Sequence, residues 1–560
     1  MKHILGINRV HNAAIALVKD GDLDFHLENE RLSNIKYDAY PFHALAKLPD
    51  YAKSIEEIGL AGVGKVVPVE YFQDSDAYTT FVSHLNKEYF NSHRTAYDFW
   101  QNHHLLHAAC AFYNSGFEEA VCVIEDGMGS EYHINDNRFL QGTYGRESSS
   151  VFTAKYPAEF TLVDKTVVVP FKCNLVLEEI VKITASVSAA LAFQKTAKQF
   201  KFHELDAGKV MGMASYGVED NNIPEIYIED KINTELFSID NGDLRKVFLN
   251  VKNYPYLDTD DFQIQANFAR ALQLTTQTHI KKHILNMIEK TNIKNVCLSG
   301  GFFLNCVANY EFLKDLPGDV NLYVEPVSSD AGTSIGAAKL LWHINEKDLT
   351  VRKIKNIYNG LEYNYSKEDI LRKIGAETVV EVDYDAVAEL LSNRKIVAMY
   401  QGRSESGPRA LGNRSILYDP RDPNGKDHVN KVKQREWFRP FAGTVLLESV
   451  NDWFDMRGLE ESPYMMFAVD VLKEQQIKIP AIAHVDGTCR VQTVTLEQNL
   501  HFYNLIKAFE KITSIPILFN TSFNLAGNCI VETIDDALET LRNSDIDFLY
   551  LPEYKLLISR

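Results

Sequence analysis

Residues 120–129 read Ala-Val-Cys-Val-Ile-Glu-Asp-Gly-Met-Gly, an apolar run that leads into an acidic turn rich in glycine. A short apolar run bounded by turn residues is typical of a buried strand. The same order of residue types occurs near the start of the chain, where the apolar residues 4–7 and 14–18 precede Lys19-Asp20-Gly21, a hairpin signal. Two such units predict a duplicated α/β domain in the first part of the chain.

Two further stretches combine a strand, a turn of small residues and a helix. Residues 296–298 lead into Ser299-Gly300-Gly301. Residues 320–324 lead to Asp330 and to the small residues 332–338. Strand, glycine turn and helix is the arrangement of many phosphate sites in α/β proteins.

The second half of the chain is expected to form a separate domain. Residues 262–290 predict one long helix of the first half, and the polar segment 345–359 then has the composition of a connector. Another α/β pattern begins after this connector, with 396–400 as its clearest early strand. We therefore predict domains over residues 1–350 and 351–560.

Composition limits the functions that the chain can have. It has 560 residues, of which 45% are hydrophobic and 24% charged, as in a folded protein of several domains. The net charge of -18 disfavours nucleic acid as a partner. No stretch approaches the ~20 apolar residues of a membrane span, so a cytoplasmic protein is expected. The seven cysteines are scattered without a C-x-x-C pair, which predicts free thiols.

A pair of histidines is a candidate metal site. Residues 98–115 have helical spacing, and His103 and His107 are four residues apart, so they share one face of this helix. Such a pair is more often a packed or surface pair than a chelate. The turns at Asp126 and Asp330 follow strands and are suited to supply carboxylates. Two histidines with carboxylates and open positions favour a divalent ion such as ferrous iron or manganese.

Glycine turns and a lysine in the first domain are candidate phosphate-binding groups. Glycine lets a phosphate approach a backbone amide because no Cβ is in the way. Tight turns and a solvated lysine explain each feature equally well when it is taken alone. The candidates are Gly127, Gly129, Lys209, Gly300, Gly301 and Asn305.

The second domain contains two basic segments that stand out in an acidic chain. Residues 401–415 and 433–441 combine arginines and lysines with glycines and with two glutamates. Guanidinium groups bind phosphate through two parallel hydrogen bonds, so several that converge favour a pocket for a triphosphate or an acyl phosphate. A solvated basic face or a nucleic-acid patch is the alternative. Lys433 and Arg435 would share one face if their segment is a strand.

Two later segments add polar groups next to expected strands. Residues 484–493 place a histidine and an arginine around a turn, and the apolar run 515–519 leads into Asn520-Thr521-Ser522-Phe523-Asn524. Sites in α/β proteins are commonly built at strand ends. Each segment alone is also consistent with an ordinary capped turn.

Taken in order, these segments resemble the carbamoyltransferase family that includes the nodulation-factor, cephamycin and tobramycin O-carbamoyltransferases. The similarity spans nearly the whole chain, and the ordered set is far more specific than any single motif. The similar stretches are residues 11–14, 30–36, 103–107, 125–127, 208–212, 300–305, 330–338, 407–415, 435–441, 484–493 and 520–524.

The resemblance implies an α/β protein in which a duplicated actin/sugar-kinase/heat-shock-chaperone-like domain precedes a YrdC-like α/β domain. It also implies an ATP-dependent carbamoyltransferase. The second domain would form carbamoyl adenylate from carbamoyl phosphate and ATP, with Mg²⁺ as the usual companion of ATP. The first domain would pass the carbamoyl group to an acceptor, usually a hydroxyl of a small molecule.

The resemblance assigns roles to individual residues. His103, His107, Asp126 and Asp330 match the metal ligands of the family, with iron as the expected ion. His11 matches a histidine beside the metal and is expected to act as general base. The residues expected to bind nucleotide, carbamoyl phosphate and adenylate are Lys36, Gly127, Lys209, Gly212, Gly300, Gly301, Asn305, Arg403, Arg409, Arg414, Lys433, Arg435, Arg439, His484, Arg490, Asn520 and Ser522.

Two other functions stay open on the sequence alone. A non-catalytic, actin-like or chaperone-like nucleotide-binding regulator would explain the glycine turns but would leave the arginine-rich segments without a task. An enzyme that carbamoylates a nucleotide or nucleic acid is the other alternative. Tyr37 stands where many relatives have histidine, and Ser215 where proline is common. No motif identifies the acceptor or the oligomeric state.

Overall fold

The computed structural model describes residues 2–48, 55–63, 96–134, 143–375 and 377–560. The chain divides into two compact units, which are described separately. Unit 1 comprises residues 1–29 and 37–354, and unit 2 comprises residues 30–36 and 355–560. The sequence did not predict that the short segment 30–36 belongs to unit 2.

The first sheet of unit 1 contains β1 (His3–Asn8), β2 (Ala14–Lys19), β3 (Asp22–Glu28), β4 (Glu57–Ala61) and β5 (Ala96–Asp98). Its strand order is β3-β2-β1-β4-β5. β1 pairs antiparallel with β2 and parallel with β4. The apolar residues of β1 and β2 are buried, as expected for strands that are covered on both faces.

The second sheet of unit 1 contains β6 (Glu119–Glu125), β7 (Glu131–His133), β8 (Tyr144–Lys155), β9 (Glu159–Val168), β10 (Asn174–Leu177), β11 (Val181–Thr184), β16 (Asn295–Ser299) and β17 (Asn321–Val324). Its strand order is β10-β11-β9-β8-β6-β16-β17, with β7 beside β8. The strands β6, β16 and β17 are parallel, so their carboxyl ends lie at one edge. Asp126 and Gly300 follow two of these strands directly, as the sequence predicts.

The described helices of unit 1 are α2 (Phe42–Lys47), α4 (His103–Ser115), α5 (Ala189–Gln199), α6 (Ala207–Ala214), α7 (Phe262–Thr291), α8 (Cys306–Asp315) and α9 (Ala331–Glu346). The expected long helix is α7, which Asp261 caps through hydrogen bonds from two backbone amides. Smaller elements are the strands β12 (Tyr227–Ile228), β13 (Lys231–Ile232), β14 (Phe237–Ile239) and β15 (Val247–Leu249), with 3₁₀ turns at Asp240–Gly242, Pro255–Leu257 and Gly301–Leu304.

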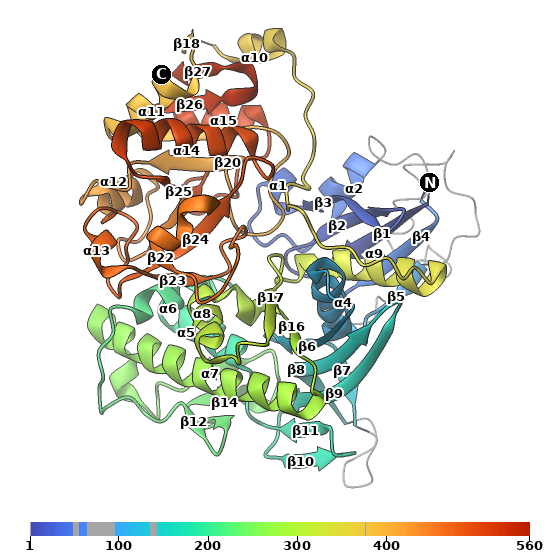
Figure 1. Cartoon of the computed structure of the whole chain (residues 1–560). Coiled ribbons are helices and arrows are strands. Elements are labelled where there is room, and N and C mark those ends of the chain that lie inside the picture. Colours follow the sequence, from blue (N-terminus) through green and yellow to red (C-terminus); the bar gives the residue numbers. More distant parts are fainter. Residues whose placement is uncertain (1, 49–54, 64–95, 135–142, 376) are drawn as a thin grey trace. The chain divides into compact units, whose positions relative to one another are not determined.

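Two helices pack between the sheets of unit 1. α9 packs on β1, β2 and β4, α4 packs on β6, β8 and β16, and the two helices pack on each other (Figure 1). A Cβ on Gly336 would lie 2.0 Å from the Leu106 carbonyl oxygen, and a Cβ on Gly6 would lie 1.9 Å from the Ser334 carbonyl oxygen. Glycine is therefore required for the close approach of α9 to α4 and to β1.

Unit 2 is built on one ten-stranded mixed sheet. Its strands are β18 (Thr378–Glu381), β19 (Val397–Tyr400), β20 (Arg414–Tyr418), β21 (Ala442–Leu446), β22 (Phe454–Asp455), β23 (Ala468–Val471), β24 (Thr488–Val494), β25 (Ile517–Ser522), β26 (Phe548–Leu551) and β27 (Leu556–Ser559). They follow the order β18-β27-β26-β19-β20-β25-β21-β24-β23-β22. β19 is the strand expected at 396–400, and all its residues are buried.

The described helices of unit 2 are α1 (Glu30–Ser33), α10 (Lys367–Lys373), α11 (Tyr384–Ser392), α12 (Gly425–Val432), α13 (Lys473–Gln476), α14 (Leu500–Thr513) and α15 (Ile534–Arg542), with 3₁₀ turns at Leu447–Asp452 and Pro552–Tyr554. α1 belongs to the segment 30–36. Arg31 of α1 is buried, and its Nη2 donates a hydrogen bond to the Gly407 carbonyl oxygen at 2.8 Å. No helix of the described residues is long and apolar enough to cross a bilayer.

Candidate metal centre and cationic cluster

Four side chains of unit 1 bring ligand atoms together. His103 and His107 come from one face of α4, Asp126 follows β6, and Asp330 precedes α9. All four residues are buried, and one potential ligand atom from each lies within 4.8 Å of the others. The histidine pair and the two strand-end aspartates that the sequence singled out therefore meet at one point.

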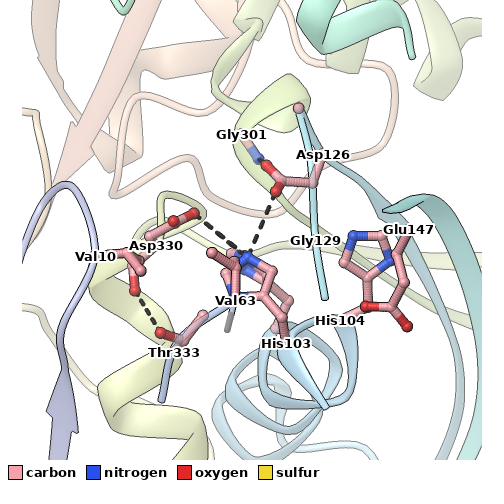
Figure 2. A network of polar contacts seen from close by, with 12 residues as sticks. Val10, Val63, His103, His104, Asp126, Gly129, Glu147, Gly301, Asp330 and Thr333 are labelled. Atoms are coloured by element: carbon pink, nitrogen blue, oxygen red, sulfur yellow. Dashed lines mark hydrogen bonds and ion pairs between the residues drawn. The ribbon is translucent and has the colours of Figure 1, made fainter. Parts of the chain in front are cut away.

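The distances show how these groups converge. His103 Nε2 lies 3.5 Å from Asp126 Oδ2 and 3.6 Å from Asp330 Oδ1. His107 Nε2 lies 3.7 Å from Asp330 Oδ1 and 3.2 Å from His103 Nε2. Figure 2 shows His103 between the two aspartates, whereas His104 points to the other side, beside Glu147. The neighbouring histidine does not share this site, as helical spacing requires.

The electrostatics of the cluster favour a positive charge. Burial alone would raise the pKa of Asp126, but a hydrogen bond from His103 and the nearby His107 lower it well below its usual range. Burial likewise opposes charge on His103, yet Asp330 and Asp126 raise its pKa to about 10. Two buried carboxylates thus require a cation between them, which a bound divalent metal would supply.

Neighbouring groups hold the ligands in place. The Gly301 amide donates a hydrogen bond to Asp126 Oδ1 at 3.1 Å, and Ser299 Oγ lies 3.4 Å from His107 Nδ1. Gly300 has φ +101°, and a Cβ there would lie 2.4 Å from the Glu125 carbonyl oxygen. The Gly300-Gly301 turn therefore supports a candidate metal ligand, a role that the sequence did not predict for it.

His11 lies next to this cluster. Its Nδ1 is 3.1 Å from Asp330 Oδ2, and its imidazole is 43% exposed. The charge of Asp330 raises the pKa of His11 to about 9, against the opposing effect of burial. Asp330 thus directs one oxygen to the histidines of α4 and the other to His11, which leaves His11 Nε2 as the ring nitrogen that Asp330 does not engage.

The nucleotide-binding residues predicted in the first domain have other contacts here. Lys209 Nζ pairs with Asp206 Oδ2 at 3.0 Å, and Tyr37 donates a hydrogen bond to Asp206 Oδ1 at 2.5 Å. Asn305 caps α8 by accepting a hydrogen bond from the Ala308 amide. The Gly127 carbonyl oxygen accepts a hydrogen bond from Ser188. Gly212 is buried within α6, and Lys36 is exposed in segment 30–36. Their roles toward a nucleotide remain predictions.

Four basic side chains of unit 2, Lys433, Arg435, Arg439 and Arg490, form what we call the cationic cluster. Burial is the main cause that lowers the pKa of Arg435, and Arg439 and Arg490 add repulsion. Burial, Arg435 and Arg439 together lower the pKa of Lys433. Lys433 is buried, the three arginines are partly exposed, and Arg439 also pairs with Glu436 at 3.6 Å. Cations that repel one another are stabilised when an anion binds among them, so the cluster is a candidate phosphate site.

Surrounding groups orient the cationic cluster. Arg435 Nε donates a hydrogen bond to Asn430 Oδ1 at 2.5 Å, and its guanidinium lies 3.9 Å from the centre of the Phe441 ring. Lys433 Nζ donates to Asn524 Oδ1 at 2.9 Å and to Ser522 Oγ at 3.2 Å. The segment is not a strand, because Lys433 is the C-cap of α12 and Gln434 has φ +55°. The condition for a shared strand face is therefore not met, and a turn brings these two basic residues into one cluster instead.

The structure describes the surroundings of three other predicted residues of unit 2. Asn520 lies within β25, not after it, and its buried Oδ1 makes no hydrogen bond among the described residues. His484 is mostly buried, with Nδ1 3.6 Å from Asp486 Oδ1. Arg409 borders the buried turn 404–407 and is exposed only in part. The roles of these three side chains as ligands remain predictions.

Two predicted phosphate-binding arginines instead hold the backbone. Arg414 is buried, and its Nη atoms donate to the carbonyl oxygens of Gln401, Gly402, Asn413 and Glu532. Arg403 donates to the carbonyl oxygens of Gly360 at 2.7 Å and Asn359 at 3.0 Å. Both guanidinium groups thus stabilise loops of unit 2. Their prediction as phosphate ligands finds no support in this geometry.

Family models match both parts of the chain. Residues 49–339 match the family model for the carbamoyltransferase N-terminus, and residues 388–558 match the model for the carbamoyltransferase C-terminus. The class of protein is thus an enzyme that transfers a carbamoyl group. The chain belongs to the carbamoyltransferase family. This assignment confirms the resemblance and favours an enzyme over the non-catalytic alternative.

Individual relatives have moderate sequence identity. Nodulation protein NolNO of Sinorhizobium fredii is 29% identical, over 97% of this chain and 78% of its own length. Nodulation protein NolO of Bradyrhizobium diazoefficiens is 30% identical, over 80% of this chain and 77% of its own. Among solved structures, HypF of T. kodakarensis has a TM-score of 0.35 and 13% identity, and covers 62% of this chain and 48% of that chain. The fold is mixed α/β, as predicted, and the actin-like character of the first domain stays a prediction.

Proposed function

We propose that this carbamoyltransferase forms carbamoyl adenylate in unit 2 and transfers the carbamoyl group to a hydroxyl of a small molecule at the metal centre of unit 1. The observation that carries the proposal is the convergence of His103, His107, Asp126 and Asp330, with His11 on the second oxygen of Asp330. The net charge of -18 favours a small acceptor over a nucleic acid.

The donor half of the reaction requires binding of two anions. Balance of atoms needs one water: carbamoyl phosphate and water give carbamate and phosphate, and a carbamate oxygen then bonds to the α-phosphorus of ATP. The bond from that phosphorus to the β-phosphate oxygen breaks, and pyrophosphate leaves. The cationic cluster supports this half, because its guanidinium and ammonium groups would bind and stabilise the phosphates.

The donor set of the metal centre fits a divalent ion. Two imidazole nitrogens and two carboxylate oxygens leave positions open, which suits ferrous iron or manganese better than a closed zinc site. Contacts from Ser299 and Gly301 supply the outer support that such sites require. A bound ion would act as a Lewis acid toward the acceptor or the carbamoyl group.

The transfer half uses His11 as the proton acceptor. The acceptor hydroxyl oxygen bonds to the carbamoyl carbon, the bond from that carbon to the adenylate oxygen breaks, and AMP leaves. The hydroxyl proton passes to His11 Nε2. Asp330 supports this step because its contact at Nδ1 fixes the orientation of the ring and stabilises the imidazolium.

The test is a measurement of both half-reactions. The protein is mixed with ATP, Mg²⁺ and carbamoyl phosphate without an acceptor, and release of phosphate and of pyrophosphate is followed. Equal amounts of both products support the adenylate, and release of phosphate alone contradicts it. Candidate hydroxyl compounds are then screened by mass spectrometry for the gain of one carbamoyl group, with His11→Asn as the matched control.

A further inference from the structure

Helix α4, which carries His103 and His107, begins at the candidate metal ligand His103. His103 is the first residue of α4, so its backbone N–H has no partner within the helix. The preceding residue, Asn102, is exposed, and its side chain makes no capping hydrogen bond. The cap comes instead from Ser130, whose Oγ accepts a hydrogen bond from the His103 amide at 3.0 Å.

Ser130 is itself fixed through all of its polar groups. Its hydroxyl donates to the Trp100 carbonyl oxygen at 2.7 Å, and its amide donates to Glu147 Oε2 at 3.1 Å. Its carbonyl oxygen accepts from the Glu147 amide at 3.1 Å. Ser130 is fully buried, so no water competes for these bonds. The oxygen that caps α4 therefore has one position and one orientation.

The support for Ser130 continues into the sheet. Glu147 lies on β8, is buried and forms an ion pair with Lys165 of β9. A Cβ on Gly129 would lie 2.9 Å from Glu147 Oε2 and 2.6 Å from His104 Nε2, so only glycine leaves room for this packing (Figure 2). Hydrogen bonds thus connect the sheet to the backbone of His103 through Glu147 and Ser130.

We infer that Ser130 is a positioning residue for the metal centre. Its hydrogen bond holds the backbone of the same residue whose Nε2 lies between Asp126 and Asp330. Metal ligation tolerates deviations of only about 0.2 Å, so a small shift of the helix start alters affinity. The inference rests on the proposed metal centre, because without a metal there Ser130 only caps a helix.

The experiment measures binding of Co²⁺, a spectroscopic probe for sites with nitrogen and oxygen ligands. The full-length chain is freed of metal and titrated with Co²⁺ as wild type, Ser130→Ala and Asn102→Ala. Loss of groups outside the first ligand sphere typically weakens metal affinity 10–100-fold, so we expect Ser130→Ala to bind about tenfold more weakly, with an altered Co²⁺ spectrum. Asn102→Ala removes no cap and should stay within about twofold of wild type.

The outcomes separate this inference from the proposed function. Failure of the wild type to bind Co²⁺ would contradict the metal centre itself. Normal wild-type binding with Ser130→Ala within about twofold of it overturns the positioning role, even if the variant melts at a lower temperature. If Ser130→Ala does not fold, Ser130→Thr is used instead, because threonine keeps the hydroxyl oxygen. Ser130→Thr should bind Co²⁺ within about threefold of wild type, and a tenfold loss of affinity contradicts the inference.

Discussion

The contact between α9 and α4 gives a direct test of how packing sets the metal centre. In Gly336→Ala the new Cβ would lie 2.0 Å from the Leu106 carbonyl oxygen and 3.2 Å from the Cys110 amide nitrogen. The helices must separate by about 1.4 Å before the first contact reaches the ordinary 3.4 Å. This movement is several times the ~0.2 Å that metal ligation tolerates, and Asp330, which precedes α9 directly, would move away from the histidines of α4.

We expect Gly336→Ala to lose stoichiometric metal and to lose about 1–3 kcal/mol of unfolding free energy from overpacking. Metal content by mass spectrometry and unfolding in denaturant measure the two effects. Gly208→Ala is the matched control, because a Cβ on that helical glycine meets nothing within 4 Å. Full metal content in a folded Gly336→Ala would refute the link between this contact and the ligand geometry.

Three further predictions concern the two half-reactions. His107→Ala should lose metal and transfer while pyrophosphate release continues; an unchanged metal content would rule out His107 as a ligand. Arg435→Ala should slow pyrophosphate release by about 2–4 kcal/mol in activation free energy, and Arg435→Lys should restore little, because lysine lacks the planar fork. Normal release by Arg435→Ala would show that the cationic cluster binds no donor. His11 must be neutral to accept a proton, and the charge of Asp330 raises its pKa, so transfer should rise with pH through the pKa of His11 and this rise should be absent in His11→Asn.

The local pattern predicts several of the strands and the residues of the candidate metal centre. The apolar run 120–125 becomes β6, and the spacing of His103 and His107 places both on one helix face, because each depends only on neighbours along the chain. Asp126 and Asp330 follow from the rule that polar groups gather at strand ends. The four side chains meet only because α4 packs against α9. The small residues Gly332 and Gly336 are the sequence feature that indicates this close packing.

Contacts between segments that are far apart in the sequence could not be predicted from local patterns. Arg414 has the same residue type and neighbours as a phosphate-binding arginine, and only the fold shows that its donors reach backbone carbonyls. Ser130 caps a helix that starts 27 positions earlier, and no sequence signal marks this partner. The turn at Gln434 has a positive φ that glutamine rarely adopts, so no local pattern marks it.

Because residues 30–36 belong to unit 2, they affect when this unit can fold during synthesis of the chain. Arg31 donates a hydrogen bond to a carbonyl oxygen 376 positions later in the chain. At about 5–20 residues per second, a ribosome needs roughly 20–75 s to make that partner. Segment 30–36 is synthesised early but can form its contacts only after residues 355–560 have been made. Unit 2 therefore reaches its native structure only when both parts of the chain are present.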